Sequence, residues 1–363
     1  MDLQSRNASL DLLKIWCMFL IVMHHFSVYS ELAYNGTNFS ERDLFLSIIS
    51  LAGKIGVNVF MLISGYFLYS SQFSIKKLIH LELVTVFFSI LFFILFVVIG
   101  DKEFSWSQLI VNLMPTTFGR YWFIKSYIFI YLLSPFINRT LRDTPKESFI
   151  GLIAILLAFG SLMPMISQLI ARNGYFDNML WLLIIYIIGA YFRKYDDDFC
   201  KCSFFLKGFL LMTLLLILGC IILYLFNLSS ENKFSMSFYR DSYNLPVILV
   251  SVFLFLLFKT LNIKKMAGLI SHLSSLMFGV YLIHENFYMR EFLWIDSLGF
   301  LMEKSSIVFV LESIFYVVLI FFICITIEFI RTKLFFNFFD KLEIFLTIKI
   351  QFFKAKLIRI LLE

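Results

Sequence analysis

The amino-acid sequence predicts an all-α protein, a polytopic membrane helix bundle of about ten transmembrane helices. Hydrophobic residues make up 60% of its 363 residues and charged residues only 15%, whereas an ordinary soluble domain has roughly 45–50% apolar and about 25% charged residues. The mean hydropathy is +0.87, and the apolar residues form runs long enough for a helix to cross the roughly 30 Å core of a bilayer. These runs exclude an outer-membrane barrel, in which polar and apolar residues alternate over strands of about ten residues.

Ten apolar stretches predict the individual spans. In chain order they cover residues 11–30, 45–70, 78–99, 121–138, 149–170, 178–192, 206–227, 244–258, 268–289 and 305–330. The sixth and eighth stretches are short and have polar neighbours, so we expect surrounding helices, more than lipid, to hold them. No small-residue cleavage motif follows the first stretch, and we therefore expect a retained first span instead of a signal peptide.

The Lys and Arg residues predict the orientation of these spans, because cytoplasmic loops carry an excess of positive charge. With the N-terminus inside, 21 of the 31 Lys and Arg residues fall in cytoplasmic segments and 8 fall on the opposite side, which leaves Lys54 and Lys125 inside spans. The distribution predicts an N-in and C-in topology.

After the last stretch, residues 333–363 alternate Phe, Leu and Ile with basic residues. After Lys333, the basic residues of this segment are Lys341, Lys349, Lys354, Lys356 and Arg359. This pattern is typical of a helix that lies on the anionic lipid of the cytoplasmic leaflet. We therefore divide the chain into a transmembrane domain, residues 1–332, and a basic amphipathic cytoplasmic tail, residues 333–363.

Two other kinds of partner are not expected. The formal net charge of +6 comes from basic residues that are dispersed between apolar stretches, which does not favour a nucleic-acid partner. Cys200 and Cys202 share one short loop without a second group of ligands, so we predict no metal site.

Ionisable side chains inside spans are costly in free energy and are the first candidates for function. His25 follows Asp11 by fourteen residues, about 21 Å along a helix, and His284 reaches a similar depth in the outer half of the ninth span. The predicted catalytic cluster consists of His25, His284, Glu285, Lys54 and Lys125. Simpler interpretations stay open, because a buried His often makes only an interhelical hydrogen bond and a Lys can extend to the membrane interface.

A second group of charged residues falls at the cytoplasmic ends of the first three spans. Lys14, Lys76 and Lys77, followed by His80, are suited to bind the phosphates of a soluble donor, and Asp11 completes this predicted donor-binding site. The positive-inside distribution alone also explains lysines at these positions, so both interpretations remain.

Four motifs occur in order along the chain. The first runs from Arg6 through Asp11 and Lys14 to His25. The others are V-N-V-F-M-L-I-S-G-Y-F-L at 57–68, Y-W-F-I-K-S-Y-I-F-I-Y-L-L-S-P-F at 121–136 and F-G-V-Y-L-I-H-E-N at 278–286. Together they resemble the integral-membrane acyltransferase 3 family, and most closely its bacterial surface-polysaccharide O-acetyltransferases.

The resemblance implies transfer of an acyl group, usually acetyl from the co-substrate acetyl-CoA, to a hydroxyl of a cell-envelope polysaccharide or its lipid-linked precursor. It also implies a multi-pass protein of the bacterial plasma membrane, with His25 and His284 at the positions of the family's two recurrent histidines. Lys14 stands where the family has Arg, and Lys76, Lys77 and His80 replace its Arg-x-x-Arg. A Lys still neutralises phosphate but loses the bidentate geometry of Arg.

Acyl transfer to a hydroxyl needs a base, stabilisation of an oxyanion and exclusion of water. We expect His25 to be the base, His284 to orient the acceptor or share its proton, and Glu285 to orient His284. Lys125 or Lys54 is expected to stabilise the oxyanion. An acyl-imidazole intermediate is the alternative to direct transfer.

Other functional classes are alternatives to an acyltransferase. A polysaccharide transporter or flippase without acyl chemistry is the main alternative, although the sequence lacks the paired Gly/Pro-broken helices of such proteins. A glycan polymerase or ligase would need larger outer loops. A homo-oligomer is compatible with the sequence.

Overall fold

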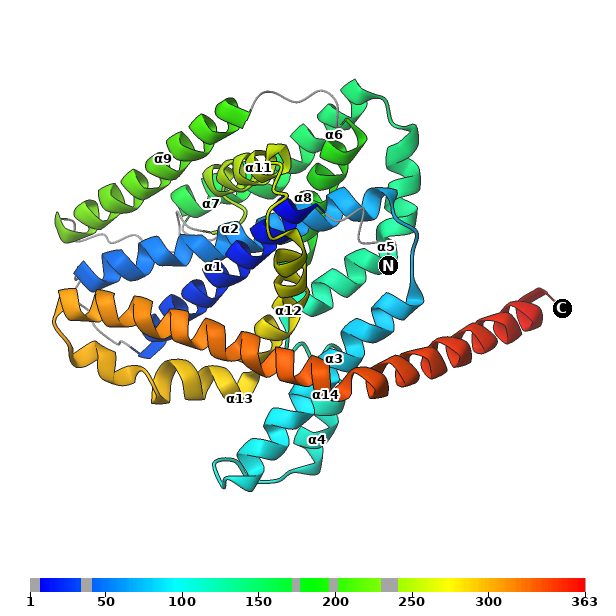
Figure 1. The fold of residues 1–363 in the computed structure, drawn as a ribbon. Coiled ribbons are helices and arrows are strands. Elements are labelled where there is room, and N and C mark those ends of the chain that lie inside the picture. The colour runs from blue at the N-terminus through cyan, green and yellow to red at the C-terminus, as the bar shows by residue number, and fades with distance from the viewer. Residues whose placement is uncertain (1–6, 34–40, 172–176, 196–201, 230–240, 363) are drawn as a thin grey trace.

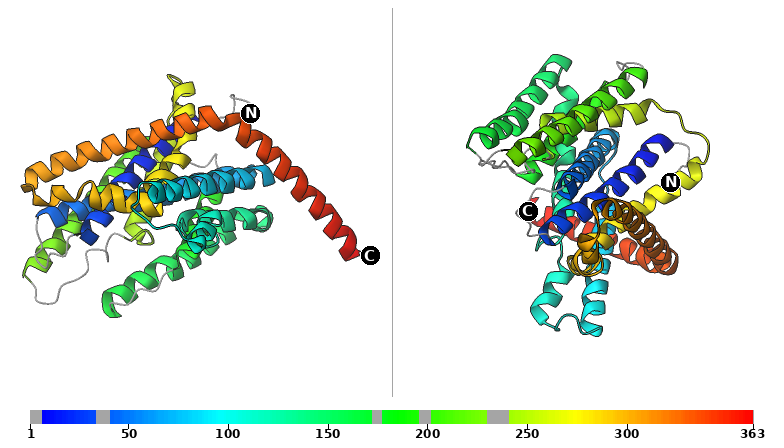
Figure 2. Two further views of the ribbon diagram at one scale, coloured as in Figure 1. Left: turned by 90° about the horizontal axis from the view of Figure 1, so that it is seen from below. Right: turned by 90° about the vertical axis from the view of Figure 1, so that its left-hand side faces the viewer.

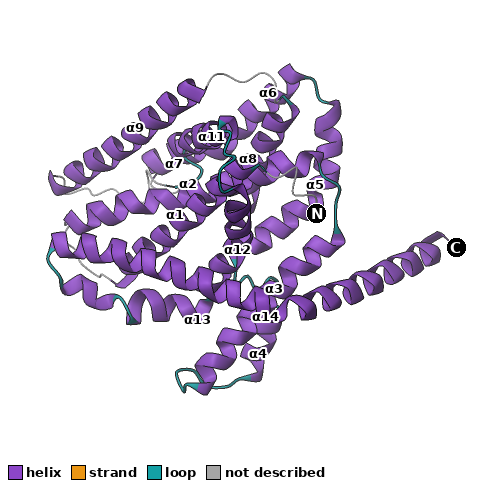
Figure 3. Cartoon of the chain, viewed as in Figure 1, coloured by secondary structure: helices purple, strands orange, loops and turns teal. Residues whose placement is uncertain are grey.

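The computed structural model describes residues 7–33, 41–171, 177–195, 202–229 and 241–362, and every regular element in these ranges is helical (Figure 3). The α-helices are α1 Ala8–Ala33, α2 Glu41–Ser70, α3 Ile75–Val98, α4 Trp106–Leu113, α5 Trp122–Asp143, α6 Lys146–Leu157, α7 Met163–Ala171, α8 Asn178–Lys194, α9 Cys202–Ser229, α11 Leu245–Thr260, α12 Ala267–His284, α13 Phe287–Arg290 and α14 Ser306–Leu362. Shorter helical turns are η2 Ala158–Leu162, η4 Glu291–Asp296 and η5 Gly299–Glu303. Arg6 and Cys200 lie outside the described residues.

The predicted all-α polytopic bundle is confirmed, since each of the ten apolar stretches coincides with helix. Within the described residues, seven helical segments are long and apolar enough to cross a membrane. They are α1, α2, α3, α6 to α7, α9, α12 and α14, and α11 is a shorter apolar helix. The count of about ten spans and the N-in, C-in topology stay predictions.

Two predicted helix boundaries differ from the structure. The ninth stretch was expected to continue to residue 289, but α12 ends at His284, and the Asn286 side chain accepts hydrogen bonds from the backbone N–H groups of Tyr288 and Met289 to start α13. The last helix does not end near residue 330, and α14 continues to Leu362. Figures 1 and 2 show that its C-terminal part extends away from the bundle. The domain boundary at residue 332 stays a prediction.

Two apolar clusters form the core. One centres on α2, α8 and α11, and the other on α1, α3, α12 and α14 (Figure 1). Val57, Phe60 and Phe123 pack against both clusters. Helix α9 packs on α11 and leaves most of its apolar side chains exposed, as expected for a helix that faces lipid. The described helices therefore have an apolar outside and a junction between two cores inside.

Helices α2 and α8 approach each other backbone to backbone at two glycines. A Cβ atom at Gly65 would overlap the carbonyl oxygen of Tyr186, and a Cβ atom at Gly189 would overlap that of Leu62. Small residues at such a crossing let membrane helices pack closely.

We expect Gly65→Ala to destabilise the protein by about 1–3 kcal/mol, because the new methyl group forces the two helices apart. The control is Gly151→Ala in α6, where no atom lies within 4 Å of the added Cβ, and this change should stabilise the helix by roughly 0.5–1 kcal/mol. Thermal unfolding in detergent measures both, and equal unfolding temperatures for the two variants would contradict the close crossing.

Candidate active site

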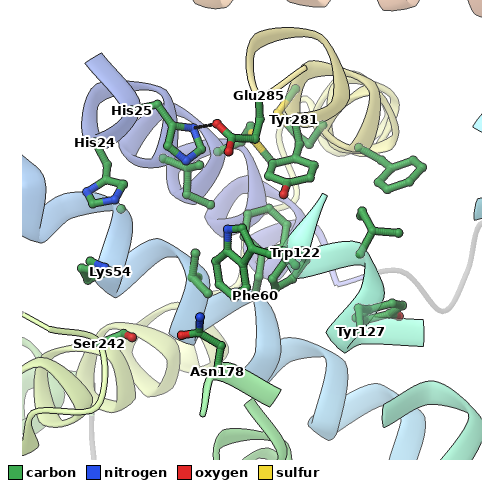
Figure 4. Close-up of a pocket in the computed structure, with 18 of the residues that line it drawn as sticks. His24, His25, Lys54, Phe60, Trp122, Tyr127, Asn178, Ser242, Tyr281 and Glu285 are labelled. Atoms are coloured by element: carbon green, nitrogen blue, oxygen red, sulfur yellow. Dashed lines mark ion pairs between the residues drawn. The ribbon is translucent and has the colours of Figure 1, made fainter. Parts of the chain in front are cut away.

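A cavity of about 500 Å³ lies at the junction of the two apolar clusters. Its walls come from α1, α2, α3, α5, α8 and α12, and Figure 4 shows several of the side chains. The lining residues discussed below are His24, His25, Tyr29, Lys54, Ser64, Trp122, Ser274, Tyr281, Glu285 and Arg290. The cavity has the size of a small-molecule site and combines apolar walls with a few polar groups.

His25 and His284 form a hydrogen-bonded pair across α1 and α12. Nδ1 of His284 lies 2.6 Å from the carbonyl oxygen of Val280, and Nε2 of His284 lies 2.9 Å from Nδ1 of His25. A carbonyl oxygen can only accept, so a neutral His284 carries its proton on Nδ1 and accepts at Nε2. His25 must then donate from Nδ1. The network therefore assigns the lone pair of His25 to Nε2.

Glu285 contacts His25 and not, as predicted, His284. Its Oε2 lies 3.3 Å from Nδ1 of His25, the ion pair drawn in Figure 4. The hydroxyl of Tyr29 donates to the carboxylate at 3.1 Å. Arg290 donates to the same hydroxyl at 3.0 Å and lies 3.4 Å from Oε1. The buried carboxylate is thus neutralised and held beside the nitrogen that carries the His25 proton.

The structure places only one of the two predicted span lysines near this group. Lys54 of α2 lines the cavity with His24, whose Nδ1 lies 2.7 Å from the carbonyl oxygen of Ser50 (Figure 4). Lys125 is exposed and does not line the cavity. Its neighbours Ile124 and Tyr127 do, and because successive residues of a helix point about 100° apart, Lys125 projects from another face of α5. The prediction that Lys125 belongs to the cluster is therefore corrected.

One lining residue of the cavity contacts the residues predicted at the cytoplasmic end of the first span. Gly53 and Ser64 both line it, so it extends about 16 Å along α2. Ser274, another lining residue, donates from its hydroxyl to Oδ1 of Asp11 at 3.1 Å. Asp11 in turn lies 3.0 Å from Nζ of Lys14. Lys14 and His25 are thereby connected to opposite ends of one cavity.

The remaining residues of the predicted donor site lie elsewhere. Lys76 and Lys77 are exposed at the start of α3. Nζ of Lys76 lies 3.1 Å from Asp340 of α14, and Nδ1 of His80 lies 2.6 Å from Glu343. The structure separates the predicted donor residues into a pair beside the cavity, Asp11 and Lys14, and a surface group that contacts α14.

Several polar groups of the site are not among the residues predicted from the sequence. Tyr29 follows His25 by four residues, so helical periodicity already places it on the same face of α1. Arg290 contacts Glu285 from the short helix α13, and nothing in the sequence shows that this helix returns it to the site. Tyr121 accepts a hydrogen bond from Asn286 at 2.8 Å, a contact between the start of α13 and the start of α5 that sequence spacing does not reveal.

One comparison with known proteins bears on this geometry. A family model described as an acyltransferase domain, acyltransferase 3, matches residues 7–329. No curated protein and no solved structure matches the chain. The family match covers most of the sequence, including every residue of the cavity named above. The chain is therefore a membrane protein that belongs to the acyltransferase 3 family.

Proposed function

We propose that this acyltransferase moves an acetyl or other short acyl group from cytoplasmic acyl-CoA to a hydroxyl of a cell-envelope polysaccharide or its lipid-linked precursor. One observation carries the proposal. A buried imidazole with its lone pair on Nε2 lines a cavity that also contains Ser274, which hydrogen-bonds to the Asp11–Lys14 pair. The proposed location is the plasma membrane of a bacterium, with lipid around the exposed apolar helices.

The proton network suits His25 to the role of general base. Nε2 of His25 accepts the proton of the acceptor hydroxyl while the hydroxyl oxygen attacks the thioester carbonyl carbon. The resulting imidazolium is stabilised by the Glu285 carboxylate, whose Oε2 lies 3.3 Å from the other ring nitrogen. When the tetrahedral intermediate collapses, the C–S bond breaks and the thiolate takes the proton from His25. His284 positions the ring throughout by accepting from Nδ1.

The length of the cavity suits an extended donor. Lys14 supplies a positive charge for a donor phosphate, and the roughly 16 Å between Gly53 and Ser64 accommodates an arm that carries the acyl group to His25. The nucleotide then stays on the side of Lys14, which the charge distribution predicts to be cytoplasmic. Lys76 and Lys77 are a second proposed contact for the donor, on the surface at the same end of the bundle as Lys14.

The proposed activity is tested with membrane vesicles that contain the protein. They receive acetyl-CoA labelled in the acetyl group and an isolated envelope polysaccharide, and hydroxylamine-labile label on the polysaccharide is measured. Vesicles without the protein are the control. If none of the envelope polysaccharides supplied becomes labelled in a way that depends on the protein, the proposed reaction is refuted.

We expect His25→Ala to reduce the turnover by about 10²–10⁴-fold, because the variant lacks the base. The amount of protein in the membrane should stay the same. His272→Ala is the matched control, since this histidine is exposed on α12 beside Phe329 and does not line the cavity. Normal turnover by the His25 variant would exclude the base assignment.

For the donor end, we expect Lys14→Met to raise the KM for acyl-CoA by about tenfold with a smaller change in kcat, because a charge-assisted contact to phosphate is lost. The double variant Asp11→Asn, Lys14→Met separates this loss from the effect of leaving Asp11 without its ion pair. Lys76→Met should raise the KM less, because this lysine belongs to the exposed surface group that contacts α14 and not to the pair beside the cavity. A larger effect at Lys76 than at Lys14 would move the donor site to α3.

A further inference from the structure

The hydroxyl of Tyr281 is an exception among the buried tyrosines of the site. In the described part of the chain no group accepts a hydrogen bond from it, although Tyr281 is only 6% exposed, and its oxygen faces the backbone N–H of Phe123. The hydroxyl of Tyr29 donates to Glu285, and that of Tyr121 donates to the carbonyl oxygen of Leu282 at 3.1 Å. A buried hydroxyl without an acceptor for its proton costs free energy. No group among the described residues offsets this cost, which suggests that a bound ligand accepts the hydrogen bond.

Tyr281 lies one turn before the His284–Glu285 pair and lines the cavity. Its ring packs edge-on against the ring of His284, with centroids 6.1 Å apart, and against that of Phe123 at 5.9 Å. In Figure 4 its hydroxyl points into the cavity, toward Trp122 at the start of α5. The hydroxyl therefore lies in the cavity beside the group formed by His25, His284 and Glu285.

Through its contact with Phe123, Tyr281 also adjoins the N-terminus of α5, a helix of 22 residues. Trp122, Phe123 and Ile124 form its first turn, and all three line the cavity. Their backbone N–H groups precede the first helical hydrogen bond, which Lys125 donates to Tyr121, and the N-cap Tyr121 makes no side-chain cap. A helix N-terminus favours negative charge. A hydroxyl whose proton has no acceptor among the described residues thus lies against a positively polarised helix end.

We propose that the Tyr281 hydroxyl, with the first turn of α5, binds the carbonyl oxygen of the acyl thioester and stabilises the oxyanion. This inference rests on the proposed acyl transfer and identifies its oxyanion site. As the acceptor oxygen bonds to the carbonyl carbon, the carbonyl electron pair moves to its oxygen, which accepts a hydrogen bond from Tyr281. The pair returns when the C–S bond breaks. Tyr281 keeps its own proton, and His25 carries the proton that passes from the acceptor to the thiolate.

The assignment also replaces the role expected of Lys125 or Lys54. Lys125 projects away from the cavity, whereas Lys54 lines it together with His24. A neutral donor is better suited to a buried site than an ammonium group, because its burial costs less free energy when substrate is absent. The acyl group supplies the acceptor that the Tyr281 hydroxyl lacks.

The test compares Tyr281→Phe with wild type in lipid vesicles, using acetyl-CoA and the polysaccharide acceptor. We expect kcat to fall about 100-fold, because one oxyanion donor is lost, and the KM for acetyl-CoA to change less than about two-fold. The thermal unfolding temperature should stay the same or rise, since the variant removes only a hydroxyl whose proton has no acceptor.

Tyr288→Phe is the matched control. Tyr288 is equally buried, accepts a hydrogen bond from Asn112 at 2.9 Å and does not line the cavity. Its variant should lower the unfolding temperature and leave kcat within about two-fold of wild type. If the wild-type protein is active and the Tyr281→Phe variant has the same kcat, the oxyanion assignment is contradicted. It is also contradicted if the variant loses activity only because it loses stability. A wild type without acyl transfer contradicts the proposed function itself.

Discussion

A backbone carbonyl can only accept, so the hydrogen bond from Nδ1 of His284 to Val280 determines where the protons of the imidazole pair lie. It requires Nε2 of His284 to be the acceptor for His25, which in turn leaves the lone pair of His25 on the ring nitrogen not engaged by His284. A base whose proton position is fixed by the main chain of a helix needs no reorganisation before reaction. The rest of the site is arranged around this constraint.

The buried charge beside the pair shows how the bundle tolerates such a site. Glu285 is 3% exposed, and an isolated carboxylate at this position would be strongly destabilising. Tyr29 and Arg290 satisfy it from two directions, so the charge is available to an imidazolium without being unpaired in the resting protein. Stability and chemistry thus depend on the same contacts.

Much of the fold was predictable, because long apolar runs that must satisfy their own backbone can only be helices. Depth along those helices also brought His25, His284 and Glu285 to one level, where the structure places them. Depth does not give rotation about the helix axis, and Lys125 was therefore assigned to a face that it does not occupy.

Other features of the site required three-dimensional information. Helix α12 ends at His284, and the Asn286 cap that starts α13 after it is not evident from the apolar run. Tyr281 looks like one more aromatic residue in such a run. Only the packed bundle shows that its hydroxyl has no acceptor for its proton among the described residues and points toward the start of α5.

The cavity that His25 and Ser274 both line has an energetic consequence for the proposed reaction. In this reaction the acceptor takes the acyl group from the thiol, and the thiol takes the hydroxyl proton of the acceptor and carries it away. Formally, an acylium unit moves outward while a proton moves inward, so each turnover is electroneutral. The membrane potential then does no net work on the exchange, and the free energy of the thioester alone drives the modification forward.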